Sequence, residues 1–94
     1  MITIIAMFEL KPECVETFLG LAEECIEASR KETGNDDYRL YKGKDNENKY
    51  FFIERWKDEQ AIETHNASAH FRKFAAGFTP LLAGSPVIEQ VVEV

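Results

Sequence analysis

Three segments of the chain alternate as β-strands do, yet they carry apolar side chains on both faces. The opposed sets are Ile5 and Met7 against Ala6 and Phe8, Phe51 and Ile53 against Tyr50, Phe52 and Trp56, and Val87 and Val91 against Ile88 and Val92. Successive residues of a strand point to opposite faces of its sheet. Helices can cover one face, and the other would then remain an exposed apolar patch of the kind that marks an interface. The sequence therefore predicts a sheet packed against helices on one face and against a second copy of the chain on the other.

The remaining patterns predict the order of the elements along the chain. The expected strands are residues 2–10, 38–42, 49–56 and 87–94, and the expected helices are residues 12–31, 58–66 and 69–82. Pro12 suits the first turn of a helix, Gly34 suits a helix end, and Ser68 suits an N-cap. The polar segment GKDNEN would join the second and third strands as a hairpin. The order β-α-β-β-α-β is the ferredoxin-like arrangement of the α+β class, with a four-stranded antiparallel sheet and helices on one face.

Length and charge limit the classes of protein to which the chain can belong. Its 94 residues suggest one domain, residues 1–94, that is small enough to be marginal as a monomer. The formal net charge is −6 and there is no basic stripe, so we expect no nucleic-acid partner and no anionic membrane partner. No apolar run approaches the ~18 residues of a membrane helix, and the first residues lack the basic start of a signal peptide. These features favour a cytoplasmic location.

Cys14 and Cys25 are the only cysteines, and both fall in the helix expected at residues 12–31. Eleven residues of helix separate them by ~16 Å, whereas a disulfide needs Cα atoms within about 7 Å of each other. We therefore expect two free thiols that pack as small core residues in a reducing compartment.

Both histidines, His65 and His70, lie in the stretch ETHNASAHF, five residues apart. On an unbroken helix their rings would point roughly 140° apart, but a break at Ser68 would let them become neighbours. The positive end of a new helix would keep His70 neutral and make it a proton acceptor, whereas His65, at a helix end, would become cationic more easily. We expect no metal site, because the histidines have no acidic partner at a suitable spacing. The alternative is that both rings only cap backbone groups.

Glu54 and Trp56 lie two residues apart on one face of the strand expected at residues 49–56. One interpretation is a pocket between sheet and helices with the indole as its wall. The other is that Trp56 belongs to the core and Glu54 is a carboxylate at the rim.

Two stretches, SRKETGNDDYRLYKG and FFIERWKDEQAIETHNASAHFRKF, resemble the antibiotic biosynthesis monooxygenase superfamily, and in particular its small quinol monooxygenase branch. The matching positions are Gly34, Asn35, Tyr38, Glu54, Trp56, His65 and His70. The resemblance covers nearly the whole chain and implies a homodimeric α/β barrel. It also implies oxidation of electron-rich phenols or quinols by O₂ without metal, flavin or haem, so no cofactor is expected.

Some positions depart from the pattern of this superfamily. Ala69 stands where its members usually have proline, so we expect a less rigid start to the last helix. Haem-degrading relatives carry an asparagine in the first strand, a tryptophan at the position of His65 and a haem-binding histidine at the position of Ala75. The first strand here has no asparagine and the other two positions differ, so we reject haem degradation.

The sequence therefore predicts a cofactor-independent monooxygenase that oxidises a small phenolic or quinol-like substrate with O₂. The predicted catalytic residues are His70 and His65, and the predicted substrate-binding residues are Trp56, Glu54, Asn66, Phe71 and Tyr38.

Two alternatives remain. An isomerase of a small ketone or sugar phosphate would share the two-histidine pattern, but binding phosphate would need a cation such as Arg30, Arg39 or Lys42 in the pocket. A non-catalytic dimer that binds a small ligand would account for the same pocket. The sequence alone leaves the substrate, and the presence of an activity, open.

Overall fold

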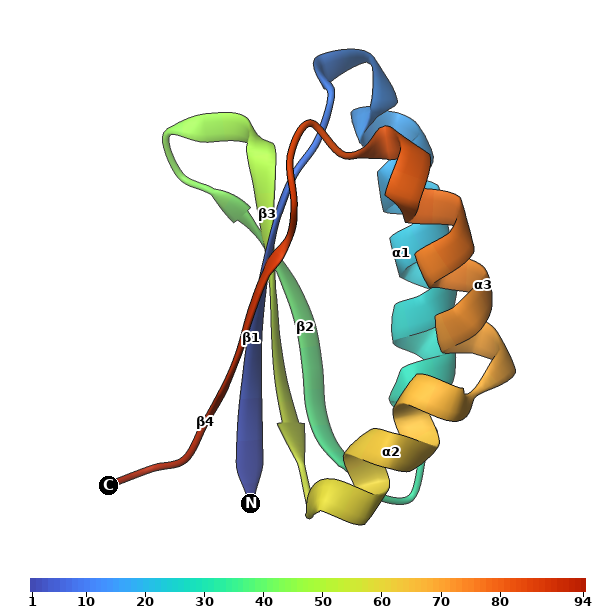
Figure 1. Ribbon diagram of the computed structural model, residues 1–94, viewed down its shortest axis with the longest axis vertical. Coiled ribbons are helices and arrows are strands. Elements are labelled where there is room, and N and C mark those ends of the chain that lie inside the picture. Colours follow the sequence, from blue (N-terminus) through green and yellow to red (C-terminus); the bar gives the residue numbers. More distant parts are fainter.

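The computed structural model describes all 94 residues as a sheet with helices on one of its faces (Figure 1). The strands are β1 (Ile2–Glu9), β2 (Asn35–Gly43), β3 (Asn46–Trp56) and β4 (Val87–Val91). Neighbouring strands are antiparallel, and they lie in the order β2-β3-β1-β4. With its helices in the order β-α-β-β-α-β, the chain has the ferredoxin-like α+β fold, which confirms the predicted fold class.

The helices form a single layer (Figure 1). They are α1 (Val15–Ser29), α2 (Glu59–Ala67) and α3 (Ala69–Phe78), with short 3₁₀ turns η1 (Pro12–Cys14) before α1 and η2 (Thr79–Leu81) after α3. Between α2 and α3 the chain leaves the helical conformation at a single residue, Ser68, whose backbone is extended. The Ser68 hydroxyl accepts a hydrogen bond from the N–H of Phe71 at 3.2 Å, so Ser68 is the predicted N-cap of the second helical piece.

The helix ends differ from the prediction near Pro12 and Pro80. Residues 12–14 form a 3₁₀ turn, and the α-helix begins only at Val15. At the other end of the layer, α3 ends at Phe78 because Pro80 lacks the N–H group that an α-helix would need.

Gly34 has a different role from the predicted helix cap. The helix α1 already ends at Ser29, and no glycine of the chain has a positive φ. Gly34 lies instead against Ala61 of α2, where a Cβ atom would collide with the alanine side chain. The absence of a side chain therefore lets α2 pack closely on the segment that leads into β2.

The strand ends follow from pairing. β2 begins at Asn35, three residues before the predicted start, because the end of β3 offers it a partner at Trp56. β4 ends at Val91, short of the predicted end at residue 94, because its partner Thr3 lies near the start of β1.

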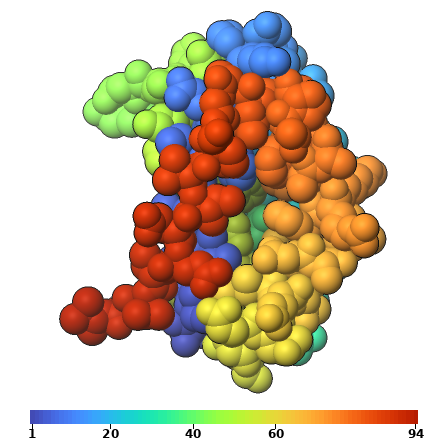
Figure 2. Space-filling model, in the orientation of Figure 1, coloured from blue at the N-terminus to red at the C-terminus, as the bar shows by residue number.

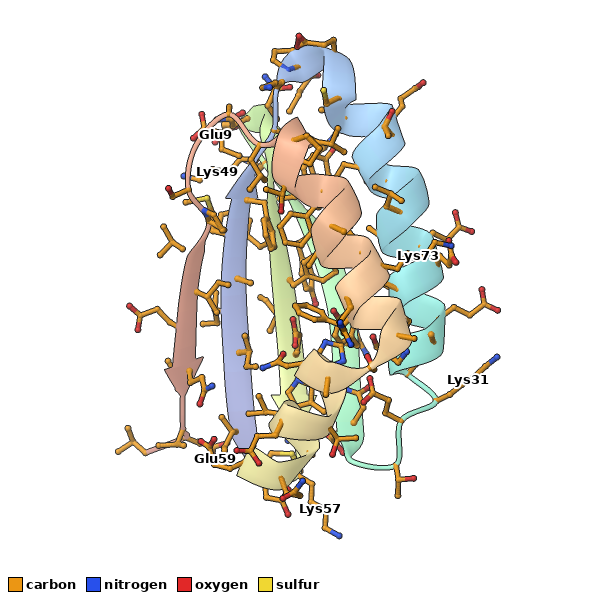
Figure 3. The ribbon with its side chains drawn as sticks, turned by 45° about the vertical axis from the view of Figure 1, so that its right-hand side comes forward. Glu9, Lys31, Lys49, Lys57, Glu59 and Lys73 are labelled. Atoms are coloured by element: carbon orange, nitrogen blue, oxygen red, sulfur yellow. The ribbon has the colours of Figure 1, made fainter.

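The core fills the space between the sheet and the helices (Figure 3). Its buried apolar residues are Ile4, Ala6, Phe8, Leu10, Phe18, Ala22, Cys25, Tyr38, Tyr50, Phe52, Trp56, Ile62, Phe74 and Phe78. The labelled side chains of Lys31, Lys57 and Glu59 extend away from this layer. Both cysteines are free, as predicted, but Cys14 precedes α1 and is only half-buried, so its assignment to the core is wrong.

The opposite face of the sheet carries no helix (Figure 1). The strand register places Ile5 of β1 beside Ile53 of β3, and both side chains are exposed. Val87 and Val91 of β4 and Tyr41 of β2 are exposed as well. The sheet is therefore apolar on both faces, as predicted. We call the face without helices the outer sheet face, and its exposed apolar side chains form a patch of the kind that marks an interface.

Candidate functional site

The break at Ser68 brings the two histidines together. His65 lies in the last turn of α2 and His70 in the first turn of α3, with their ring centroids 5.8 Å apart. Both rings contact one atom of a third residue, Glu32, which follows α1. The Oε2 atom of Glu32 lies 2.7 Å from Nδ1 of His65 and 2.8 Å from Nε2 of His70.

His65 is the buried member of this cluster, with a side chain only 2% exposed. Its ring packs against the Trp56 indole, with centroids 4.5 Å apart and planes tilted by 37°, and also packs against Phe71. Because Nδ1 faces the Glu32 carboxylate, this nitrogen carries the proton of the neutral ring and Nε2 holds the lone pair. Nε2 has no hydrogen-bond partner.

Burial lowers the pKa of His65 below its ordinary value, although Glu32 acts in the opposite direction. The expectation that His65 becomes cationic more easily is therefore wrong, because the loss of water outweighs the favourable end of the helix. The neutral ring offers an unshared proton-accepting nitrogen.

A cavity of about 390 Å³ lies between the sheet and the helices α2 and α3. Its lining residues are Ile4, Ala6, Phe8, Tyr38, Phe52, Glu54, Ile62, His65, Asn66, Phe71, Phe74, Phe78, Ile88 and Gln90. Figure 2 shows the surface hollowed between β4, in red, and the α2–α3 segment, in yellow to orange. Most of the lining is apolar and it includes no lysine or arginine, which suits a small uncharged ligand with few polar groups.

Glu54 is the one carboxylate of this lining, and it is 6% exposed. Its Oε1 atom accepts a hydrogen bond of 2.9 Å from Nε1 of Trp56. Burial raises the pKa of Glu54 to about 7, and the charge of Glu32 adds to this effect, while the bond from Trp56 opposes it. The interpretation of Glu54 as a rim carboxylate is therefore wrong, because its strand face lies under the helices.

Trp56 is fully buried and does not line the cavity. The prediction of an indole wall is wrong in this respect. The ring lies behind the cavity surface, where it supports His65 by packing and Glu54 by its hydrogen bond.

His70 does not line the cavity either. Its side chain is 24% exposed and borders a much smaller hollow beside Cys25 and Lys73. It is linked to the cavity through its neighbour His65, with which it shares the Glu32 carboxylate.

The other predicted residues lie on the cavity. Asn66 and Phe71 flank the helix break, and Tyr38 comes from β2 on the sheet side. Burial raises the pKa of the Tyr38 hydroxyl, so this group stays protonated. Sequence reasoning missed Gln90, although its alternation with Val91 on the last strand places it on the helix side.

Glu32 is the principal residue that sequence reasoning missed. It lies 33 positions before His65 and 38 before His70. It belongs to the stretch SRKETGN, two residues before Gly34, and that neighbourhood was the only signal available. Its place at the cluster corrects the expectation that the histidines have no acidic partner.

These three residues are also the group that could hold a metal ion. Their ligand atoms all lie within 4.8 Å of one another. Two hydrogen bonds to one carboxylate oxygen account for the same convergence.

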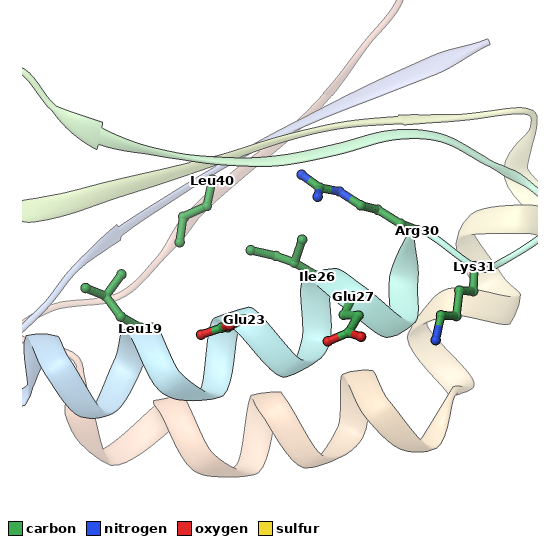
Figure 4. Close-up of a pocket in the computed structure, with 7 residues that line it drawn as sticks. All are labelled: Leu19, Glu23, Ile26, Glu27, Arg30, Lys31 and Leu40. Carbon is green, nitrogen blue, oxygen red and sulfur yellow. The ribbon is translucent and has the colours of Figure 1, made fainter.

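A second hollow, of about 680 Å³, opens between α1 and β2 (Figure 4). It is lined by Leu19, Glu23, Ile26, Glu27, Arg30, Lys31 and Leu40. Although it is larger, it is an open groove and contains none of the predicted catalytic residues. Arg30 is engaged there by a bond of 3.0 Å from its Nε to the carbonyl oxygen of Tyr38.

None of the helices combines the length and the apolar composition that crossing a membrane would require.

Comparisons with known proteins identify the family of the chain. The sequence profile of the family described as "Antibiotic biosynthesis monooxygenase" matches residues 1–77. A protein of Bacillus subtilis named "Putative monooxygenase YcnE" is 41% identical over 83 residues, which are 88% of this chain and 87% of that protein.

Solved structures show the same fold. A crystal structure described as an antibiotic biosynthesis monooxygenase superposes with a TM-score of 0.96 at 26% identity, covering 100% of this chain and 99% of the other. A conserved protein from Methanosarcina mazei Go1 has a TM-score of 0.93 at 31% identity, covering 96% of this chain and 89% of the other. From its sequence and its fold, the chain belongs to the antibiotic biosynthesis monooxygenase family.

Proposed function

We propose that this protein is a monooxygenase that oxidises a small phenolic or quinol substrate with O₂ and needs no cofactor. One observation carries the proposal. A buried neutral imidazole, His65, is held through Nδ1 by Glu32, keeps Nε2 unpartnered, and lines an apolar cavity.

The chemistry begins with proton transfer. Nε2 of His65 takes the phenolic proton, and Glu32 stabilises the imidazolium that forms. The phenolate is electron-rich enough to pass one electron to O₂, and the resulting radical pair joins as a peroxide at a ring carbon. The apolar cavity would hold the two reactants together.

The overall reaction needs no external reductant. A phenol with a free ring carbon and O₂ give a quinone and water, so one oxygen atom enters the product and the other leaves as water. The substrate supplies all four electrons. His65 is assigned as the base in preference to His70, because only His65 lines the cavity.

The arrangement of cations argues against a phosphorylated substrate. Arg30 bonds to the carbonyl of Tyr38, Arg39 pairs with Asp37, and Lys42 is exposed on β2. None of these three cations lines the cavity, so a phosphate group would be buried without a counter-charge. Two other candidate functions, an isomerase of a neutral ketone and a non-catalytic binder, are distinguished from the monooxygenase by the oxygen-uptake experiment below.

The proposal includes a homodimer formed through the outer sheet face. That face exposes Ile5, Ile53, Val87 and Val91. A second copy would cover these side chains and would pack behind β3, the strand that carries Glu54.

Oxygen uptake with a panel of phenols and quinols tests the function. We expect uptake by the wild type, and with ¹⁸O₂ we expect one labelled atom in the quinone. His65→Asn should lower kcat by roughly 10²-fold, whereas Glu63→Gln, an exposed change on the same helix, should not. The rate of the wild type should fall with decreasing pH through a pKa below 6.5, because protonated His65 cannot accept the phenolic proton.

Absence of O₂ uptake across the panel would overturn the monooxygenase. Conversion of a ketone without O₂ would then favour the isomerase, and binding without turnover would favour the ligand binder. Full activity in His65→Asn would refute the assignment of the base.

A further inference from the structure

Glu54 is buried without a cation. The charged and titratable groups that interact with it are Glu32 from the segment after α1, Cys25 from α1 and Tyr38 from β2, and His65 from α2 lines the same cavity. On β1 its register partner is the apolar Ile4. Its single hydrogen bond comes from the Trp56 indole. A carboxyl group in such surroundings costs stability, so packing does not explain its presence.

Glu54 and His65 both contact the Trp56 side chain. The Trp56 indole donates its N–H to Oε1 of Glu54 at 2.9 Å, and its ring packs against His65 with centroids 4.5 Å apart. Both side chains line the same cavity. Trp56 therefore holds the carboxyl group of Glu54 and the imidazole of His65 in place at one cavity.

The proposed reaction needs an acid as well as a base. After the peroxide forms on the ring carbon, it takes the proton from the His65 imidazolium, which restores neutral His65. The carbon–hydrogen bond and the oxygen–oxygen bond must then both break. The first releases a proton to a base, and the second releases hydroxide, a poor leaving group unless it receives a proton.

We propose that Glu54 is a second catalytic residue, which gives its carboxyl proton to the hydroxide that leaves when the oxygen–oxygen bond of the ring peroxide breaks. His65 takes the proton of the ring carbon, the electrons of that bond form the second carbonyl, and water departs. Transfer of the proton from His65 back to Glu54 restores both groups. The inference rests on the proposed monooxygenase and makes a para- or ortho-quinone the expected product class.

The protonation state of Glu54 supports this role. Burial raises its pKa to about 7, so a large share of the enzyme holds the carboxyl proton at neutral pH. His65 is neutral in the same range, because burial lowers its pKa. A carboxyl group with a raised pKa and an imidazole with a lowered pKa on one cavity are characteristic of sites that transfer protons.

The test compares Glu54→Gln, Glu54→Asp and the exposed control Glu63→Gln. In the wild type, kcat should decline at alkaline pH through a pKa of about 7, as Glu54 loses its proton. Glu54→Gln should lower kcat by about 10²-fold with little change in KM, and it should abolish the alkaline decline. Glu54→Asp should recover part of the rate, and Glu63→Gln should match the wild type.

A single-turnover experiment distinguishes an acid from a structural residue. In Glu54→Gln, O₂ should be consumed at a rate close to that of the wild type, and quinone should appear only after a delay, because the peroxide waits for a proton. If the wild type consumes O₂ and Glu54→Gln keeps both the wild-type rate and the alkaline decline, the role of Glu54 is overturned and the proposed function stands. A wild type without O₂ uptake would overturn both this role and the proposed function.

Discussion

Glu32 shows how one side chain can define a site. Its Oε2 atom receives hydrogen bonds from two imidazole rings, and only one of these rings, His65, lines the cavity. The carboxylate thereby determines which nitrogen of His65 carries the proton, and the second ring closes the outer side of the carboxylate. At this scale the proposed function depends on the orientation of one imidazole, that of His65.

Glu54 predicts an unusual dependence of stability on pH. An acid whose folded-state pKa exceeds its unfolded value holds its proton in the folded state while the unfolded chain releases it, so the folded state loses stability as pH rises from about 4.5 to about 7. The loss from this group amounts to about 3 kcal/mol if the pKa rises from 4.5 to about 7. Glu54→Gln should remove it.

Thermal unfolding at pH 5 and pH 8 provides the measurement. Relative to the wild type, Glu54→Gln should gain stability at pH 8 and show little gain at pH 5. Glu63→Gln, which changes an exposed carboxylate, should follow the wild type at both values. An equal effect of Glu54→Gln at the two pH values would contradict the raised pKa.

The helix break is the decisive element. Without the extended Ser68, α2 and α3 would continue as one helix and the two rings could not both reach Glu32. Ala69, the first residue of α3, occupies a position where proline suits the geometry, and the backbone of Ser68 (φ −69°, ψ 151°) is the conformation that a following proline favours.

Ala69→Pro should therefore stabilise the protein by about 0.5–1 kcal/mol, because it restricts the unfolded chain and leaves the native backbone unchanged. Ala67→Pro, two residues earlier in the last turn of α2, should destabilise it instead. Urea denaturation with both variants measures the two effects. A loss of stability in Ala69→Pro would mean that the break is held in another conformation.

At the scale of the whole molecule, the outer sheet face predicts assembly. Sedimentation at micromolar concentration should give a species of two chains of 10.8 kDa each. Ile53→Lys places a charge in the centre of that face and should dissociate the dimer and lower its melting temperature. Thr64→Lys adds the same charge at an exposed position of α2 and serves as the control. A wild type that sediments as a monomer would refute the dimer.

The sequence by itself determined the architecture. Alternation in the strands, the polar hairpin segment and Ser68 with its capping hydroxyl are local signals that the structure contains, although the hairpin turn is confined to residues 44–45 because β3 already begins at Asn46. They are readable because strand periodicity and helix capping depend on residues a few positions apart. The resemblance of two motifs likewise placed the chain in its family.

Only the tertiary structure decided which residues meet at the candidate site. Glu32 reaches His65 and His70 across 33 and 38 positions, the helices bury Glu54, and the cavity has His65 and not His70 on its wall. Each of these facts depends on how separate elements pack. Burial and the packing of distant segments shift the pKa values of Glu54 and His65, and no local pattern in the chain encodes these shifts.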